Sequence, residues 1–404
     1  MPLAPPPAPE DPALRLRRAA EEMDWVMRFP LATAPGLVFV GARTTPARLV
    51  AGVDPALSGS HAGGAETQAA AFAACLGEAS EFLSQFERPG DLLPPGHGLE
   101  AVASGLDWTP PTADQVRALR LHDGAEVAVS ADRCLRRAGT PEPPVRLGLG
   151  CAAGRTLDEA RLHAVLELVE RDAAALWWRA GAPPRPLDPC DPALAPAFAR
   201  IAAWRGEETS RSLWFADLTS DLGIPVAAAF AADADPAADS PALTIGVAAR
   251  PAMAEAILSA AREAIQGELA LTLLAERLAH HGESVLTEGD RALLARADLD
   301  PAADPRLAPR GRPRRQVPAA EAASDGRADQ RSLQRVVEQL AASQHHVLSV
   351  TLTRDRPGLP VAWVMSPTLQ PDPSPLETPR LHAAVLKLAA TQGGRRPSPE
   401  PSLW

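Results

Sequence analysis

Acidic and amide side chains spaced three residues apart recur in three alanine-rich, apolar stretches of the sequence. If these stretches are helices, the two members of each pair lie on one face, and the apolar residues around them indicate burial. Buried carboxylates are costly unless a cation or a hydrogen-bonded partner neutralises them. The pairs are Glu78 and Glu81 in residues 69–86, Glu167 and Glu170 in residues 157–178, and Glu263 with Gln266 in residues 253–278.

Five carboxylates need more positive charge than one neighbouring arginine, Arg171, provides. Carboxylate oxygens suit Mg²⁺ ions that bridge nucleotide phosphates. A second interpretation is that each acid pairs with a surface arginine on a solvated face, since arginine is abundant here. The residues alone leave these two interpretations equally open.

The elements that carry these side chains repeat along the chain. Residues 147–160 match residues 243–256 without a gap, and each segment reads as a short apolar strand, a glycine turn and the start of a helix. The match continues, with Glu167 and Glu170 opposite Glu263 and Gln266, and a looser third copy runs from Gln68 through Glu81. We therefore expect three related helices whose polar groups converge on one site.

Strand-like runs at residues 36–41 and 347–352 interleave with alanine-rich helical runs. This alternation predicts an α+β (mixed α/β) fold. We expect an N-terminal segment, residues 1–57, whose first 13 residues are disordered, followed by one domain over residues 58–404. Residues 295–331 read as a mobile surface loop, and the proline-dense residues 367–379 and 393–404 should form no regular element. Trp177 and Trp178 are expected to pack in the core.

Composition excludes several classes of protein. The net charge of −10 argues against a nucleic-acid partner. The only lysine, Lys387, lies in no P-loop motif, and neither HExxH nor GxSxG occurs. Without an apolar run of about 18 residues we expect no membrane span, and the start of the sequence lacks the apolar core of a signal peptide. The four cysteines form no CxxC pair, so we expect reduced, buried thiols and a cytoplasmic location.

One segment closely resembles the signature of the YcaO family. Gly150 to Gly154 form a glycine- and alanine-rich turn, followed by Glu159-Ala160 and by the ExxER run Glu167 to Arg171. Residues 77–81 resemble the first such helix of the family and residues 246–266 the third. Two LT…PV segments, at residues 218–226 and 352–361, and the proline-rich residues 397–401 add to the resemblance, which extends from about Ser58 to the end.

The resemblance implies the YcaO fold, built from the repeated strand–turn–helix units around a site for ATP and Mg²⁺. Carried over by position, it implies metal ligands at Glu78, Glu81, Glu167, Glu170 and Glu263. It implies nucleotide contacts at Glu159, Arg171, Gln266, Gly150 and Gly154. It also implies that Arg171, Glu170, Pro401 and Trp404 belong to the catalytic group.

The reaction implied is a cyclodehydration, in which a Cys, Ser or Thr side chain of a ribosomal precursor peptide adds to the preceding carbonyl. ATP phosphorylates the resulting oxygen, and loss of phosphate closes a thiazoline or oxazoline ring. Formation of a thioamide or amidine, and a degenerate scaffold without catalysis, are the alternatives. The implied partners are the precursor peptide, a leader-binding protein similar to ubiquitin-activating enzymes, a flavin dehydrogenase and a second copy of the chain.

Some positions depart from the family pattern. Phe82 and Ser259 stand where arginines are usual, and Gly148 replaces a usual serine. Three residues, 402–404, follow the proline-rich stretch, whereas azoline-forming relatives end close to it. The missing arginines predict weaker nucleotide binding, while the main acids are retained.

Overall fold

The computed structural model describes residues 12–103, 105–206, 209–235, 240–314, 316, 326–391, 400 and 402–403. Its helices are α1 (Pro12–Glu21), η1 (Pro46–Arg48), α2 (Gln68–Ser84), η2 (Ala131–Arg133), α3 (Leu157–Trp178), α4 (Ala195–Arg205), α5 (Met253–His281), η3 (Glu283–Val285), α6 (Glu288–Ala297), α7 (Gly326–Ala342) and α8 (Pro379–Thr391). None of the helices in these ranges is both long and apolar enough to cross a bilayer.

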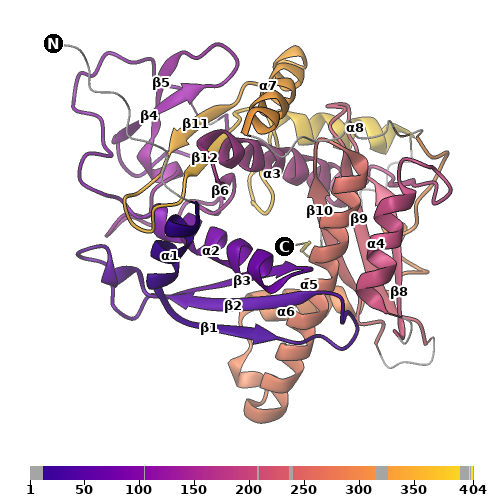
Figure 1. Ribbon diagram of the computed structural model, residues 1–404. Coiled ribbons are helices and arrows are strands. Elements are labelled where there is room, and N and C mark those ends of the chain that lie inside the picture. The colour runs from indigo at the N-terminus through magenta and orange to yellow at the C-terminus, as the bar shows by residue number, and fades with distance from the viewer. Residues whose placement is uncertain are drawn as a thin grey trace.

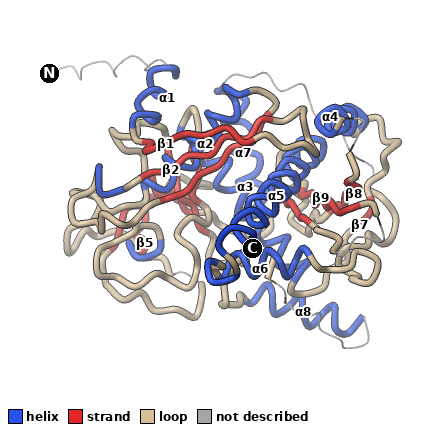
Figure 2. Tube along the Cα trace, turned by 90° about the horizontal axis from the view of Figure 1, so that it is seen from below, coloured by secondary structure: helices blue, strands red, loops and turns tan. Residues whose placement is uncertain are grey.

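Three antiparallel sheets accompany the helices. The strands are β1 (Met23–Phe29), β2 (Val38–Thr44), β3 (Gly59–Ala65), β4 (Gln115–Arg120), β5 (Glu126–Ser130), β6 (Cys151–Ala153), β7 (Arg185–Pro186), β8 (Arg211–Asp217), β9 (Val226–Asp233), β10 (Thr244–Ala249), β11 (Leu348–Thr351) and β12 (Val361–Met365). The strand orders are β1-β2-β3, β10-β9-β8-β7 and β5-β4-β11-β12-β6. Helices α2, α3 and α5 meet in the middle of the molecule (Figure 1, Figure 2). The predicted mixed α/β fold is confirmed.

Helix α3 lies at the centre because its sequence is apolar on nearly every side. Fifteen of its 22 residues are buried, and Trp177 and Trp178 are each 1% exposed, as expected for core residues. Its first turn is fixed by Thr156, whose hydroxyl accepts a hydrogen bond from Glu159 N at 3.1 Å. The helix therefore holds its few polar side chains on a rigid, packed element.

The predicted repeat corresponds to three strand–helix units: β3 with α2, β6 with α3, and β10 with α5. In the third unit, Gly246 allows the strand to lie against its helix, because a Cβ there would be 2.1 Å from Ala260 O. In the second unit, Gly150 has φ +74°, and a Cβ there would be 2.3 Å from Val364 O of β12. Close backbone approach thus explains both glycines of the repeat.

The N-terminal residues are continuous with the first unit. Strands β1 and β2 form one sheet with β3, in which Val40 of β2 pairs with Gly63 of β3. A boundary at residue 57 therefore falls inside a sheet, and the segment from Met23 supports the unit that carries α2. Residues 1–11, part of the segment expected to be disordered, lie outside the described ranges.

Two predictions about the surface are wrong in part. Within the segment predicted as a mobile surface loop, Arg306 and Leu307 are buried, because Trp177 Nε1 donates to Arg306 O at 2.8 Å and the Arg306 guanidinium covers the Trp178 ring at 3.8 Å. Both ends of that segment are helical, in α6 and α7, and residues 315 and 317–325 are not described. Of the four thiols expected to be buried, Cys190 is exposed.

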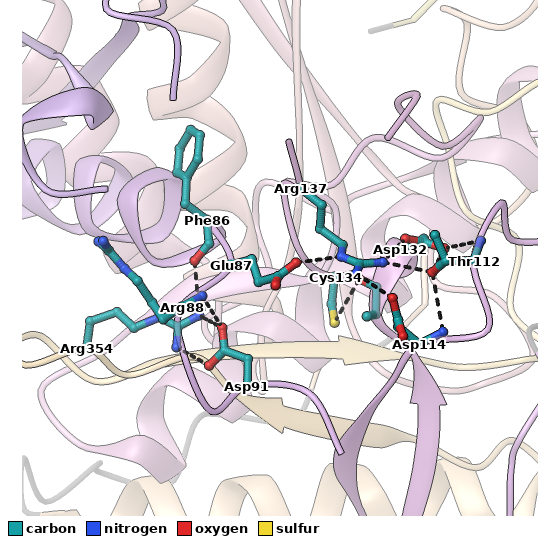
Figure 3. Close-up of polar contacts among 11 residues, drawn as sticks. Phe86, Glu87, Arg88, Asp91, Thr112, Asp114, Asp132, Cys134, Arg137 and Arg354 are labelled. Carbon is teal, nitrogen blue, oxygen red and sulfur yellow. Dashed lines mark hydrogen bonds and ion pairs between the residues drawn. The ribbon is translucent and has the colours of Figure 1, made fainter. Parts of the chain in front are cut away.

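Two arginine-centred networks fix the loop that follows α2 (Figure 3). Arg354 donates to both carboxylate oxygens of Asp91 at 2.6 and 2.9 Å and also to Phe86 O. Arg137 donates to Glu87 at 2.6 Å and to Asp132 at 2.7 Å. Because bidentate, charge-assisted bonds are strong and geometrically specific, these contacts tie the end of α2 to the sheet of β4, β5 and β11.

Candidate active site

In each of the three strand–helix units, one glutamate of the helix is hydrogen-bonded to a backbone N–H of the same unit. The carboxylate at the first position of the i, i+3 pair accepts a hydrogen bond from a backbone N–H beside the strand that precedes its helix. This contact satisfies the acid and fixes its rotamer. The bonds run from Ala62 N to Glu78 at 2.9 Å, from Gly150 N to Glu167 at 3.0 Å, and from Val247 N to Glu263 at 3.0 Å.

The second position of each pair reaches the next unit instead. Glu81 of α2 accepts from Ala153 N of β6 at 2.8 Å, and Glu170 of α3 accepts from Ala249 N of β10 at 3.4 Å. In the third unit this position is Gln266 of α5, which lines a cavity together with Ala62 and Gly63 of β3. The spacing of three therefore joins the first unit to the second and the second to the third, and it brings five carboxylates and one amide to one centre.

Burial away from solvent disfavours the ionised form of these carboxylates. Burial, together with the charges of neighbouring glutamates, raises the pKa of Glu81 and of Glu170 to about 8. Glu78 faces a cavity but is otherwise enclosed by protein, which raises its pKa to about 7. The pKa values of Glu167 and Glu263 are also raised, chiefly by burial. The cluster thus lacks enough positive charge to ionise fully.

Arg171 is the cation at the centre of the cluster. Its Nη2 donates to Glu167 at 3.3 Å, and its Nε lies 3.7 Å from a Glu170 oxygen. Burial alone would lower the pKa of Arg171, but Glu170, Glu167 and Glu263 raise it above its ordinary value. Several acids thus share the charge of one guanidinium, so the negative charge of the cluster can be neutralised by further cations.

Two cavities meet at this cluster and share Glu263 and Gln266 as a common wall. The larger, about 700 Å³, is lined by Glu167, Arg171 and Arg296 among others. The smaller, about 210 Å³, is lined by Glu78 and Glu170 from the other two helices. The carboxylates therefore line both cavities, as a site that joins two ligands requires.

The arrangement fits Mg²⁺ held together with phosphates. Within the described residues, no group of three or more His, Cys, Asp or Glu side chains could by itself hold a metal ion. Mg²⁺ typically takes one or two carboxylates and completes its shell with water and phosphate oxygens. Paired carboxylates with raised pKa values beside a cavity match this ligand set, because a bound cation would favour their ionised form.

Glu159 and the two glycines predicted as nucleotide contacts lie at the edge of this centre. The Glu159 carboxylate accepts from Arg155 N at 2.6 Å and from Arg155 Nε, so it is paired with its own helix start. Gly150 N donates to Glu167, and Gly154 N donates to Pro360 O at 3.0 Å. None of these three residues is among those that line the two cavities.

Pro401 and Trp404, the predicted catalytic residues of the C-terminal tail, lie outside the described residues. Their neighbours reach the site: Arg296 Nη1 donates to Ser402 O at 2.7 Å, and Leu403 is 5% exposed and lines the larger cavity. The segment around the two predicted residues therefore approaches the cavity that Arg171 lines.

Sequence reasoning missed several arginines at the site. Arg136 and Arg296 line the larger cavity, and Arg250 and Arg262 line the smaller one. The sequence did contain a signal for Arg262, because this residue lies one helical turn after Ser259 on the face that carries Glu263. No sequence pattern indicated Arg136, since only the tertiary structure brings its guanidinium over the ring of Phe82, 5.2 Å from the ring centre.

Comparison with known proteins shows the family. Residues 62–370 match the family model described as "YcaO cyclodehydratase, ATP-ad Mg2+-binding". No curated protein sequence gives a significant match.

Several solved structures share the fold. A heterocyclase in complex with substrate and cofactor has a TM-score of 0.71 and 22% identity over 97% of this chain, which spans 57% of that protein's length. YcaO from Methanopyrus kandleri, bound with AMPPCP and Mg²⁺, has a TM-score of 0.60 and 18% identity, covering 89% of this chain and 92% of that one. A chain of the E. coli microcin synthetase McbBCD complex has a TM-score of 0.58 and 13% identity, covering 86% of this chain and 89% of that one.

Proposed function

The chain belongs to the YcaO cyclodehydratase family, which binds ATP and Mg²⁺, and from this premise we propose that it is an azoline-forming cyclodehydratase acting on a ribosomal precursor peptide. The observation that carries the proposal is the set of helix glutamates bonded to strand amides, which lines two adjoining cavities with carboxylates. A nucleotide with its metal ions and a peptide amide would occupy adjoining spaces. The similar heterocyclase solved with substrate and cofactor supports this assignment.

Within the proposal, Glu78, Glu81, Glu167, Glu170 and Glu263 hold Mg²⁺, with Gln266 beside them. Bound ATP supplies the phosphoryl group that turns an amide oxygen into a leaving group. Arg171 remains cationic because three acids surround it, so it can stabilise negative charge that develops at the junction of the two cavities. The Arg171 side chain is only 17% exposed, and this partial removal from solvent strengthens the interaction.

The larger cavity is proposed to take the peptide. Its lining combines apolar side chains, such as Leu149 and Ile245, with Arg171, and Glu263 stands in the wall shared with the smaller cavity. An extended peptide could bury side chains there while one carbonyl faces the shared wall. The tail residue Leu403 lines part of this cavity, and we propose that Pro401 and Trp404 take part in the reaction.

Partner proteins are part of the proposal. The similar McbBCD chain belongs to a microcin synthetase complex, and that complex has also been solved with pro-MccB17 bound. We propose a separate leader-binding partner similar to ubiquitin-activating enzymes, a downstream flavin dehydrogenase, and a homodimer in the cytoplasm. Co-purification of the chain with its precursor and candidate partner tests the assembly.

Calorimetric titration with ATP in the presence of Mg²⁺ tests the proposed site. Binding should be lost in Glu167→Gln and in Glu170→Gln. It should persist in Glu126→Gln, an exposed acid on β5 that pairs with Arg117. If the wild-type protein binds no ATP even with its precursor and partner, the catalytic proposal is wrong and the scaffold alternative holds.

Product analysis separates the azoline reaction from thioamide or amidine formation, which use the same activation. Loss of one water, 18 Da, localised by fragmentation to a Cys, Ser or Thr and its preceding carbonyl indicates an azoline, whereas the same loss between a carbonyl and an amine of the precursor indicates an amidine. Exchange of oxygen for sulfur, with a gain of about 16 Da, indicates a thioamide. An amidine or a thioamide product would keep the nucleotide site and overturn the assigned ring chemistry.

A further inference from the structure

The face of α5 that lines the smaller cavity carries an arginine the family pattern does not place there. Ser259, Arg262, Glu263 and Gln266 follow one another at helical spacing, and all four line this cavity. The family pattern has an arginine at the position of Ser259. The serine leaves space on this face, and the cation stands one turn further along the helix.

Arg262 is held firmly in this position. Its aliphatic stem passes beside Gly64 of β3, where a Cβ would lie 3.6 Å from Arg262 Cγ. Its guanidinium lies over the ring of Trp204 on α4, 5.7 Å from the ring centre, and α4 runs beside α5 in Figure 1. Stacking of this kind orders a guanidinium without using its hydrogen-bond donors.

Glu66, the acid near Arg262, is already paired with other residues. Glu66 Oε1 accepts from Trp204 Nε1 at 2.6 Å and from Arg200 Nη2 at 2.8 Å. Among the described residues, Arg262 Nε is buried and has no hydrogen-bond partner. A buried donor without a partner costs free energy, so this side of the cavity favours a ligand with acceptor oxygens.

A second arginine adds to the positive charge. Arg250, which follows β10, lines the same cavity and donates to the carbonyl of its neighbour Ala249 at 2.6 Å. Burial lowers the pKa of Arg262, and the nearby charges of Arg250 and Arg200 also oppose its charge. An anion between Arg250 and Arg262 would relieve this repulsion.

We propose that Arg262, supported by Arg250, binds the phosphate groups of the nucleotide and replaces the arginine that is missing at Ser259. The inference rests on the proposed ATP site and concerns which residues of this chain serve it. Glu78 and Glu170 from the other two helices, with Glu263 beside Arg262 on α5, would hold the metal ions, and Arg262 would contact phosphate oxygens directly. Guanidinium–phosphate bonds are charge-assisted and geometrically specific, as this role requires.

The test measures the affinity for ATP with Mg²⁺ by calorimetry in three variants of the full chain. Arg262→Gln should weaken binding by about tenfold or more, the usual effect of losing a charge-assisted hydrogen bond. Arg277→Gln is the matched control, since Arg277 lies on the same helix but pairs with Asp290 at the surface. The double variant Ser259→Arg, Arg262→Ser should recover most of the affinity. Thermal unfolding of each variant without ligand shows whether it is folded.

The outcomes separate the inference from the function it rests on. If wild type binds ATP and folded Arg262→Gln binds equally well, Arg262 has no role and the inference is overturned while the ATP site stands. If Arg262→Gln loses affinity but the double variant does not recover it, the result contradicts the inference that an arginine at either position can contact the phosphates. If wild type binds no ATP with precursor and partner present, both proposals are wrong.

Discussion

The Glu170 carboxylate on α3 accepts a hydrogen bond from Ala249 N, the last residue of β10, at 3.4 Å. This bond joins the second and third strand–helix units, and Glu81 joins the first unit to the second in the same way. The proposed metal ligands are thus also the contacts that hold the units together. Changes at these acids should therefore separate into effects on stability and effects on ligand binding.

Glu81→Gln should leave the fold intact and weaken metal binding. Because burial raises the pKa of Glu81 to about 8, the metal-free protein at pH 7 holds this side chain mostly protonated. Glutamine has nearly the same shape as the protonated acid, so we expect the free energy of unfolding to change by less than about 1 kcal/mol. The affinity for ATP with Mg²⁺ should fall by at least about tenfold, because a neutral amide is a poor Mg²⁺ ligand. Chemical denaturation and calorimetry check the two effects, and equal affinity would remove Glu81 from the metal site.

Stability of the metal-free protein should fall as the pH rises. The folded pKa values of Glu78, Glu81 and Glu170 are raised to about 7 or 8. The folded protein therefore binds more protons than the unfolded chain between about pH 4.5 and pH 8. This contribution to stability is fully present below the unfolded pKa and is lost as the pH rises through the folded values.

Thermal unfolding in EDTA from pH 5 to 8.5 measures this dependence. The slope should become shallower when Mg²⁺ and ATP are added, since bound cations favour the ionised carboxylates. A variant with all three acids changed to glutamine is the control and should show a shallower slope without ligand. An identical slope in that variant would mean that these acids are not the source.

Arg296→Met should release the tail from the larger cavity. Arg296 Nη1 donates to Ser402 O at 2.7 Å, and Leu403 is buried next to it. Without this anchor we expect faster cleavage of the C-terminal residues by a carboxypeptidase and slower peptide-dependent ATP hydrolysis, while ATP affinity stays within about threefold because the smaller cavity is unchanged. Arg335→Met on α7, away from both cavities, is the control. Loss of ATP affinity in Arg296→Met would place this arginine in the nucleotide site.

Gly150→Ala should be much more destabilising than Gly124→Ala. Both glycines have nearly the same left-handed backbone, with φ +74° and +73°. A Cβ at Gly150 would lie 2.3 Å from Val364 O, whereas a Cβ at Gly124 would meet nothing within 4 Å. Gly124→Ala should therefore cost only the backbone strain, about 1 kcal/mol, and Gly150→Ala at least about 2 kcal/mol more. Denaturation in urea measures both, and similar losses would contradict a tight contact between the glycine turn and β12.

The sequence by itself determined the features that depend on local spacing. The apolar pattern predicted residues 157–178 as a helix, and α3 has these bounds. The repeat predicted that Glu167 and Glu263 occupy equivalent places, and each accepts an N–H from its own unit. The resemblance to the YcaO family is confirmed by the family match. These features follow from helical periodicity within one short segment, so no distant contact is needed to predict them.

Only the tertiary structure decided how the units meet. It shows that Glu81 and Glu170 bond to strands of other units, and that Glu159 pairs with Arg155 instead of facing the cavities. It also shows that Arg262, which helical spacing places on the face of Ser259 and Glu263, lines the smaller cavity. Such contacts join residues far apart in the chain, and helical spacing fixes which side chains share a face but not what that face will meet.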